Sequence, residues 1–179
     1  YFQPEIQPFI NEKWFPKYNK DNYRLRDNKW VEDLKKELQD DFYEKRKIGE
    51  NDDEICKLIQ KDLIEEFIIY VNKNCYPVNS TINSSIYETN NFLLKKQNIT
   101  LIEYAVFFGS IQIFNYLRQN DAELKSSLWL YAVHGKDPEI INFLEENKIQ
   151  DIKGKNTLFT NNVSFEQIFK ESIKCHHID

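Results

Sequence analysis

The 179-residue sequence contains no methionine, only four glycines and five prolines, and three cysteines. Such scarcity of glycine and proline disfavours an all-β fold with many tight turns. Because a natural chain starts with methionine, we expect residues to precede Tyr1. The cysteines are odd in number and lack the C-x-x-C spacing of zinc or redox motifs, so we expect reduced thiols in a cytoplasmic protein. We assign no cofactor.

Long apolar runs and basic patches are also missing. A helix needs ~20 apolar residues to span a bilayer, and the best run, 63–71, is interrupted by Glu65 and Glu66. The net charge is −5 and no stretch forms a basic stripe, which argues against a nucleic-acid interface. With 41% apolar and 30% charged residues, the chain has the composition of a globular protein rather than a disordered one. We expect neither membrane nor nucleic acid as a partner.

Signatures of catalysis are missing as well. The four glycines form neither a Walker-type loop nor a G-x-G-x-x-G turn. Paired acidic residues at 40–41 and 65–66 lie beside apolar stripes, which favours solvent-facing helix surfaces over a glycosidase pair. A cysteine hydrolase would need a base beside Cys56 or Cys175, and no signature marks one. We therefore predict no catalytic residues and no enzymatic activity.

One group of potential metal ligands stands out. It comprises Cys175, His176 and His177, together with His134, and both residue types are good zinc ligands. Adjacent ligands in one short run rarely chelate a metal tetrahedrally, and no second pair has the spacing of a structural site. The alternative is that His176 and His177 lie at the break between two paired helices. We favour this alternative and assign no metal site.

Helical periodicity dominates the rest of the chain. Apolar residues recur every four positions over 28–47, which predicts an amphipathic helix after a proline-containing arm. Residues 50–73 have the pattern of two shorter helices, and 84–95 that of another. We divide the chain into an N-terminal arm with its helix, residues 1–49, and a helical repeat domain, residues 50–179.

An internal repeat organises the second part of the chain. Thr100 to Glu103 form a capping box, and the helix that follows should break at Gly109. A similar unit follows at an offset of 27 residues, with its break at Gly135. The offset matches Leu101 with Leu128, Tyr104 with Tyr131, Ala105 with Ala132, Val106 with Val133, Ile113 with Ile140, and Leu117 with Leu144. Each unit predicts a helix, a tight break and a second helix, and such pairs bury their apolar faces only by stacking in arrays.

Two further copies are less regular. Residues 53–71 form a degenerate copy before the regular pair. A copy after them places Ser172 at the small-residue position and Ile178 at the start of its second helix. Since the sequence stops at Asp179, we expect this last repeat to be truncated and the array to continue beyond it.

The repeat unit resembles the ankyrin repeat. Residues 100–117 contain its threonine, alanine, glycine break and second helix ending in leucine, and 120–124 stand where that family has a Gly-Ala-Asp turn. The family's proline and histidine are replaced by Leu101 and Glu103. Over roughly residues 50–179 the chain is similar to the divergent ankyrin-like domain of unknown function expanded in parasitic protists.

This resemblance implies an all-α solenoid of stacked antiparallel helix pairs with an N-terminal helical cap. It also implies a scaffold that binds another protein without catalysis, through loop tips and the exposed surface of the first helices. The implied protein-binding residues are Asn120, Asp121, Glu123, Lys136 and Asp137. Two alternatives stay open: a purely structural repeat segment of a larger chain, and a metal-dependent enzyme with a Cys/His site.

Overall fold

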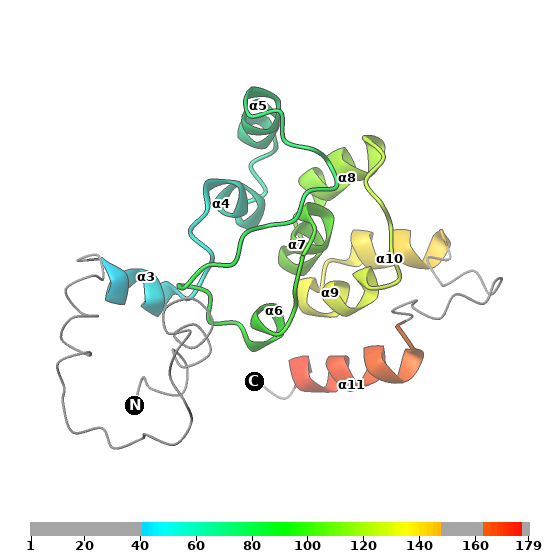
Figure 1. The fold of residues 1–179 in the computed structure, drawn as a ribbon. Coiled ribbons are helices and arrows are strands. Elements are labelled where there is room, and N and C mark those ends of the chain that lie inside the picture. Colours follow the sequence, from blue (N-terminus) through cyan, green and yellow to red (C-terminus); the bar gives the residue numbers. More distant parts are fainter. Residues whose placement is uncertain (1–40, 148–162, 177–179) are drawn as a thin grey trace, which may run out of the picture.

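The computed structural model describes residues 41–147 and 163–176, and its regular elements in these ranges are all helices (Figure 1). They are α3 (Phe42–Ile48), α4 (Glu54–Gln60), α5 (Ile64–Lys73), α6 (Asn91–Leu94), α7 (Leu101–Phe108), α8 (Ile111–Gln119), α9 (Leu128–Gly135), α10 (Pro138–Glu146) and α11 (Phe165–His176). The all-α prediction is confirmed. Among these helices, none is long and apolar enough to cross a bilayer. The arm, most of the helix predicted over 28–47, and Ile178 lie outside the described residues.

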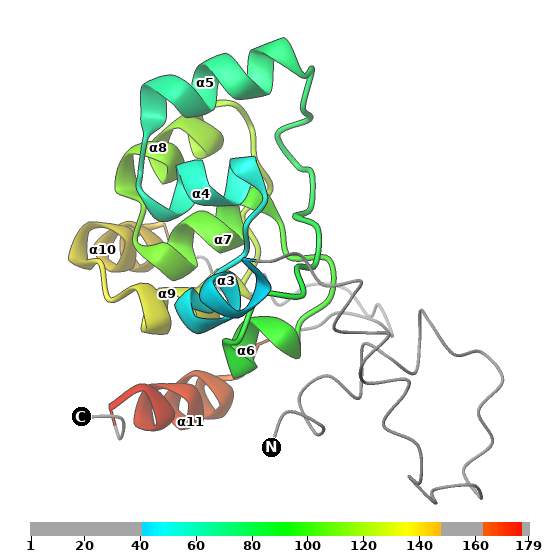
Figure 2. The ribbon, with the colours of Figure 1, turned by 90° about the vertical axis from the view of Figure 1, so that its left-hand side faces the viewer.

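The helices pair as the repeat pattern predicts. Helix α4 contacts α5, α7 contacts α8, and α9 contacts α10. The first helices of these pairs also contact one another in chain order, α4 with α7 and α7 with α9, and α11 packs on α9 as the next first helix. The second helices α5, α8 and α10 do the same. Figure 2 shows the two rows descending side by side.

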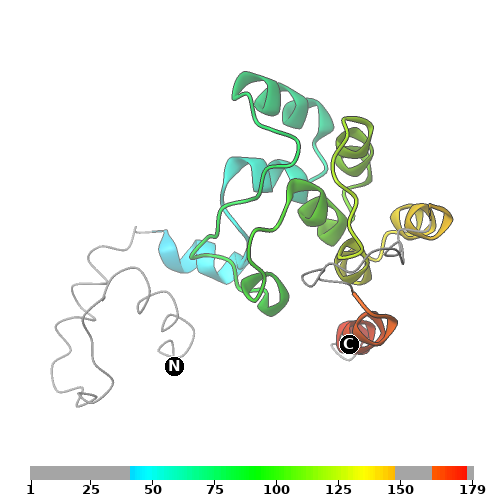
Figure 3. The same cartoon turned by 45° about the vertical axis from the view of Figure 1, so that its right-hand side comes forward.

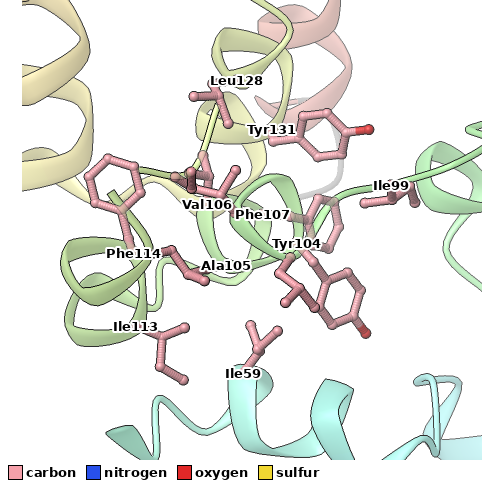
Figure 4. Close-up of a cluster of buried hydrophobic side chains, with 14 of the residues drawn as sticks. Ile59, Ile99, Tyr104, Ala105, Val106, Phe107, Ile113, Phe114, Leu128 and Tyr131 are labelled. Atoms are coloured by element: carbon pink, nitrogen blue, oxygen red, sulfur yellow. The ribbon is translucent and has the colours of Figure 1, made fainter. Parts of the chain in front are cut away.

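Helix α7 lies at the centre of the core. Seven of its eight residues are buried, as expected for a helix that is apolar all round. In Figure 4, Ile59 of α4 and Ile113 of α8 lie on one side of α7, and Leu128 and Tyr131 of α9 lie on the other. Ala105 is fully buried between these helices. Burying each large apolar side chain contributes about 1.5–3 kcal/mol, so the stack is held chiefly through α7.

The two helix breaks differ from the prediction in one respect. Gly109 ends α7 in the left-handed conformation, with φ 68°. At the 27-residue offset, Lys136 ends α9 in the same conformation, with φ 53°. Gly135 is therefore the last helical residue and not the break that we predicted. A Cβ on Gly135 would overlap the carbonyl oxygen of Val106, so this glycine is needed for the close approach of α7 and α9.

Side chains cap the helices within and between pairs. The capping box predicted for α7 is confirmed: the Glu103 N–H donates to Thr100 Oγ1 at 3.3 Å, and the Thr100 N–H donates to Glu103 Oε2 at 2.9 Å. Glu103 also accepts a hydrogen bond from Ser127 Oγ at 2.6 Å, which joins this cap to the start of α9. Asp62 accepts from the N–H of Ile113 at 3.0 Å. Asp62, in the turn between α4 and α5, thus caps the second helix of the next pair, α8.

The helix predicted over 84–95 is wrong in its first half, because only α6 forms there. The guanidinium of Arg46 in α3 donates from Nη1 to the backbone carbonyls of Ile86 and Glu88, each at 2.7 Å. In a helix, the N–H groups of Asn90 and Phe92 would donate to these two carbonyls, but they donate to the side chains of Glu88 and Asn90 instead. Asn90 caps α6, because its Oδ1 accepts a hydrogen bond from the N–H of Phe92 at 2.9 Å. This cap fixes where the helix starts.

Candidate functional site

The five predicted binding residues lie at two opposite ends of α9. Asn120, Asp121 and Glu123 belong to the connection between α8 and α9, before the N-terminus of α9. Lys136 and Asp137 form the turn after its C-terminus. Eight helical residues separate the two groups, or about 12 Å at 1.5 Å per residue. The structure therefore does not gather the five residues on one small surface.

The connection between α8 and α9 exposes Asn120, Asp121 and Glu123, buries Ala122, and is held by hydrogen bonds. Asp121 has a left-handed backbone with φ 63°, which aspartate tolerates better than most residues. The N–H of Glu123 donates to Asn79 Oδ1 at 2.8 Å, and its carboxylate lies 3.1 Å from Lys125 Nζ. This connection is thereby joined to the segment that follows α5, so two neighbouring loops form one edge of the stack.

The turn after α9 has a structural role in part. The carboxylate of Asp137 caps α10 by accepting from the N–H of Ile140 at 2.9 Å. Its side chain is half-buried, whereas Lys136 is exposed. Sequence reasoning missed the capping role of Asp137, although an aspartate directly before a proline at the first helical position is a typical start signal.

A polar cluster forms where α11 packs on α9. His134 lies in the last turn of α9, and Glu171 and Cys175 lie one turn apart on α11. The distance from His134 Nε2 to Glu171 Oε1 is 3.1 Å, and that from Cys175 Sγ to His134 Nδ1 is 3.4 Å. Lys174 Nζ lies 2.8 Å from the other oxygen of Glu171. Figure 3 shows α11 at the end of the row of first helices, beyond α9.

Aromatic rings hold the imidazole of His134 in place. Its ring centroid lies 4.3 Å from that of Phe92 in α6 and 5.0 Å from that of Phe107 in α7. The side chains of His134 and Glu171 are 17% and 14% exposed. The cluster is thus half-buried, with an apolar floor and one side toward solvent.

This environment shifts the three pKa values in different directions. Burial lowers the pKa of His134 below its ordinary value, although Glu171 opposes the shift. Burial acts to raise the pKa of Glu171, but hydrogen bonds from Lys174 and His134 outweigh it, and the pKa falls below its ordinary range. Burial and the charge of Glu171 raise the pKa of Cys175. At neutral pH the cluster therefore pairs a protonated thiol with a neutral imidazole, unlike an activated nucleophile.

Sequence reasoning found part of this cluster. It grouped His134 with Cys175, and the structure places them in contact. It missed Glu171, although the four-residue spacing to Cys175 would place both on one helix face. Helix α11 runs through His176, so the break that we expected at this residue is wrong by at least one position. His177 lies outside the described residues.

A surface hollow elsewhere is a weaker candidate for a functional site. It lies between the start of α4 and the segment before α6, and its polar side chains bond one another. Asn83 Nδ2 donates to Asp53 Oδ2 at 3.1 Å, and Ser85 Oγ donates to Asp52 Oδ1 at 3.0 Å. These groups fasten the long connection after α5 to α4, so we assign them to the fold.

In comparisons with known proteins, no family model, no curated protein and no solved structure matches the chain.

Proposed function

We propose that this chain is a protein-protein interaction scaffold of ankyrin type, an α-solenoid without catalytic activity that works in the cytoplasm. The main support is the register of stacking: first helices contact first helices and second helices contact second helices, from α4 to α11. Each added pair places its loop beside the previous loop, which extends a surface rather than enclosing a pocket. An extended surface suits a protein partner better than a small molecule. The three cysteines are free, which fits a reducing compartment.

The loop edge supports the same proposal. Besides the bond from the Glu123 N–H to Asn79, the segment after α5 forms an isolated antiparallel bridge between Thr81 and Thr100. Backbone hydrogen bonds of 2.8 and 3.0 Å flank this bridge. Loops braced in this way lose little conformational entropy on binding, which favours affinity. We assign the partner surface to this edge, with Asn120, Asp121 and Glu123 exposed along it.

Charge neutralisation at this edge tests the proposal. Asp121→Asn combined with Glu123→Gln removes two carboxylates and keeps a residue that tolerates the left-handed backbone. Glu145→Gln combined with Glu146→Gln removes two exposed carboxylates from α10 and serves as the matched control. The full chain captures partners from a lysate of its source cells, and quantitative mass spectrometry compares the variants.

We expect at least one protein to be enriched on the native chain and on the α10 control, and to be depleted several-fold on the loop variant. A partner that binds all three chains equally would contradict the assignment of this edge. If nothing is enriched on the native chain, the alternative of a structural repeat segment within a larger chain is favoured instead.

A further inference from the structure

We propose that His134, Glu171 and Cys175 form a zinc-binding site that clamps α11 to α9. One ligand atom from each residue can be chosen so that all three lie within 4.8 Å of one another. This inference does not depend on the proposed scaffold function. It revises our expectation from the sequence, where no metal site was assigned, because Glu171 now joins the group.

The distances suit a tetrahedral ion after small side-chain adjustments. Zinc bonds of 2.0–2.3 Å place neighbouring ligand atoms about 3.3–3.8 Å apart. In the cluster, His134 Nε2 lies 3.1 Å from Glu171 Oε1 and 3.8 Å from Cys175 Sγ. Three protein ligands leave a fourth position for water or an incoming group, as in zinc sites with an open coordination position.

The chemistry of the ligands selects the metal. A sulfur, an imidazole nitrogen and a carboxylate oxygen together match zinc, whereas magnesium and calcium prefer oxygen alone. Cys175 carries its proton in the metal-free chain and would release it when a cation binds. Its thiolate and the carboxylate of Glu171 would then present two negative charges to a divalent cation. Lys174 opposes the cation, but its ammonium contacts the second oxygen of Glu171 and its side chain is 68% exposed, so it can turn toward solvent.

The location of the site gives the ion a structural task. Glu171 and Cys175 share one face of α11, while His134 belongs to α9. None of the side chains of α11 that the structure describes is buried, and Phe169 and Ile173 are 55% and 41% exposed. Among the described side chains of α11, apolar burial is therefore partial. An ion bound by both helices would add a cross-link, because metal binding to a folded arrangement stabilises that arrangement.

The repeat supplies a clean variant for the test. At the 27-residue offset, His134 corresponds to Phe107 of α7, and both rings belong to the same aromatic cluster with Phe92. His134→Phe should therefore keep the packing and remove the ligand. Cys175→Ser removes the sulfur. Cys75→Ser changes an exposed thiol outside the cluster and is its matched control.

Cobalt provides a direct optical readout. The full chain, freed of any purification tag and stripped with a chelator, is titrated with Co²⁺ and then with Zn²⁺. We expect one Co²⁺ per chain, with a sulfur-to-cobalt charge-transfer band that Zn²⁺ abolishes. His134→Phe and Cys175→Ser should each weaken binding by at least about 10-fold, and Cys175→Ser should also lose the band. Cys75→Ser should retain both the affinity and the band. Circular dichroism of the metal-free variants checks that each is folded.

Hydrogen exchange tests the clamp separately. Zinc should slow amide exchange in α11 of the native chain and leave His134→Phe unchanged. The site is refuted if Cys175→Ser binds cobalt as tightly as the native chain, or if the cobalt complex shows no sulfur band. The clamp is refuted if the native chain binds zinc while exchange in α11 stays as fast as before.

Discussion

At the scale of single residues, two glycines that look alike in sequence act differently. Gly109 supplies the left-handed end of α7, and Gly135 supplies room between α7 and α9. Gly135→Ala would push a methyl group into the carbonyl of Val106, which belongs to a backbone and cannot turn away. We expect a loss of about 1–3 kcal/mol in the free energy of unfolding, measured by urea denaturation.

Lys136→Gly is the matched control for this substitution. It relieves the left-handed conformation of a residue that has a Cβ and should be neutral or stabilise the chain by up to about 1 kcal/mol. If Gly135→Ala were as stable as the native chain, the close approach of the two helices would not depend on this glycine.

Glu88 is a single residue that should make the stability of the folded chain depend on pH. Burial raises the pKa of this carboxyl above its ordinary 4.5, and the charge of Glu50 adds to the shift, while the backbone N–H groups of Asn90, Thr89 and Asn51 oppose it. The folded chain thus binds this proton more tightly than the unfolded chain. The corresponding stabilisation is fully present below the unfolded pKa and is lost as pH rises through the folded pKa.

Glu88→Gln should remove the loss of stability that the native chain suffers as pH rises. The amide oxygen can keep the hydrogen bond that Oε1 accepts from the Asn90 N–H at 2.7 Å, without a buried charge. We expect the variant to match the native chain in acid and to exceed it in stability near neutral pH, as measured by urea unfolding across pH. A native chain that gains stability over the variant as pH rises would show that the buried carboxylate is favourable.

At the scale of helices, the sequence predicts those whose signals are local. The helix pair α7 and α8 begins with its own capping box and breaks at its own glycine, so 27-residue matching was enough to find it. The helix predicted before α6 does not form. In this segment the carbonyl of Ile86 binds the side chain of Arg46, which lies 40 residues away in the sequence. Periodicity takes no account of such a partner, and a tertiary contact overrides a weak helical preference.

The same distinction explains the candidate site. The sequence identifies His134 and Cys175 by residue type alone, but Glu171 becomes relevant only once α11 packs on α9. The five loop residues were grouped because the resemblance to ankyrin repeats places them all at loop tips, whereas the length of α9 keeps the two groups apart. Residue chemistry was therefore predictable, and proximity depended on how first helices stack.

At the scale of the whole molecule, the stack should be least stable at its end. In stacked repeats each unit is stabilised mainly by its neighbours. Helix α7 contacts first helices on both sides and has seven buried residues, whereas α11 contacts α9 and has no buried side chain among those described. The free energy needed to open a helix should therefore fall from α7 through α9 to α11.

Native-state hydrogen exchange on the metal-free full chain measures this order. Amides of α7 should exchange most slowly, through opening close to global unfolding, and those of α11 should exchange at least about 100-fold faster, which corresponds to a difference near 2.7 kcal/mol. Ala105→Gly, in the centre of α7, should accelerate exchange in α4, α7 and α9 together, because all three share its core. Equal protection of α7 and metal-free α11 would mean that the chain opens as one unit, and α11 would then need no clamp.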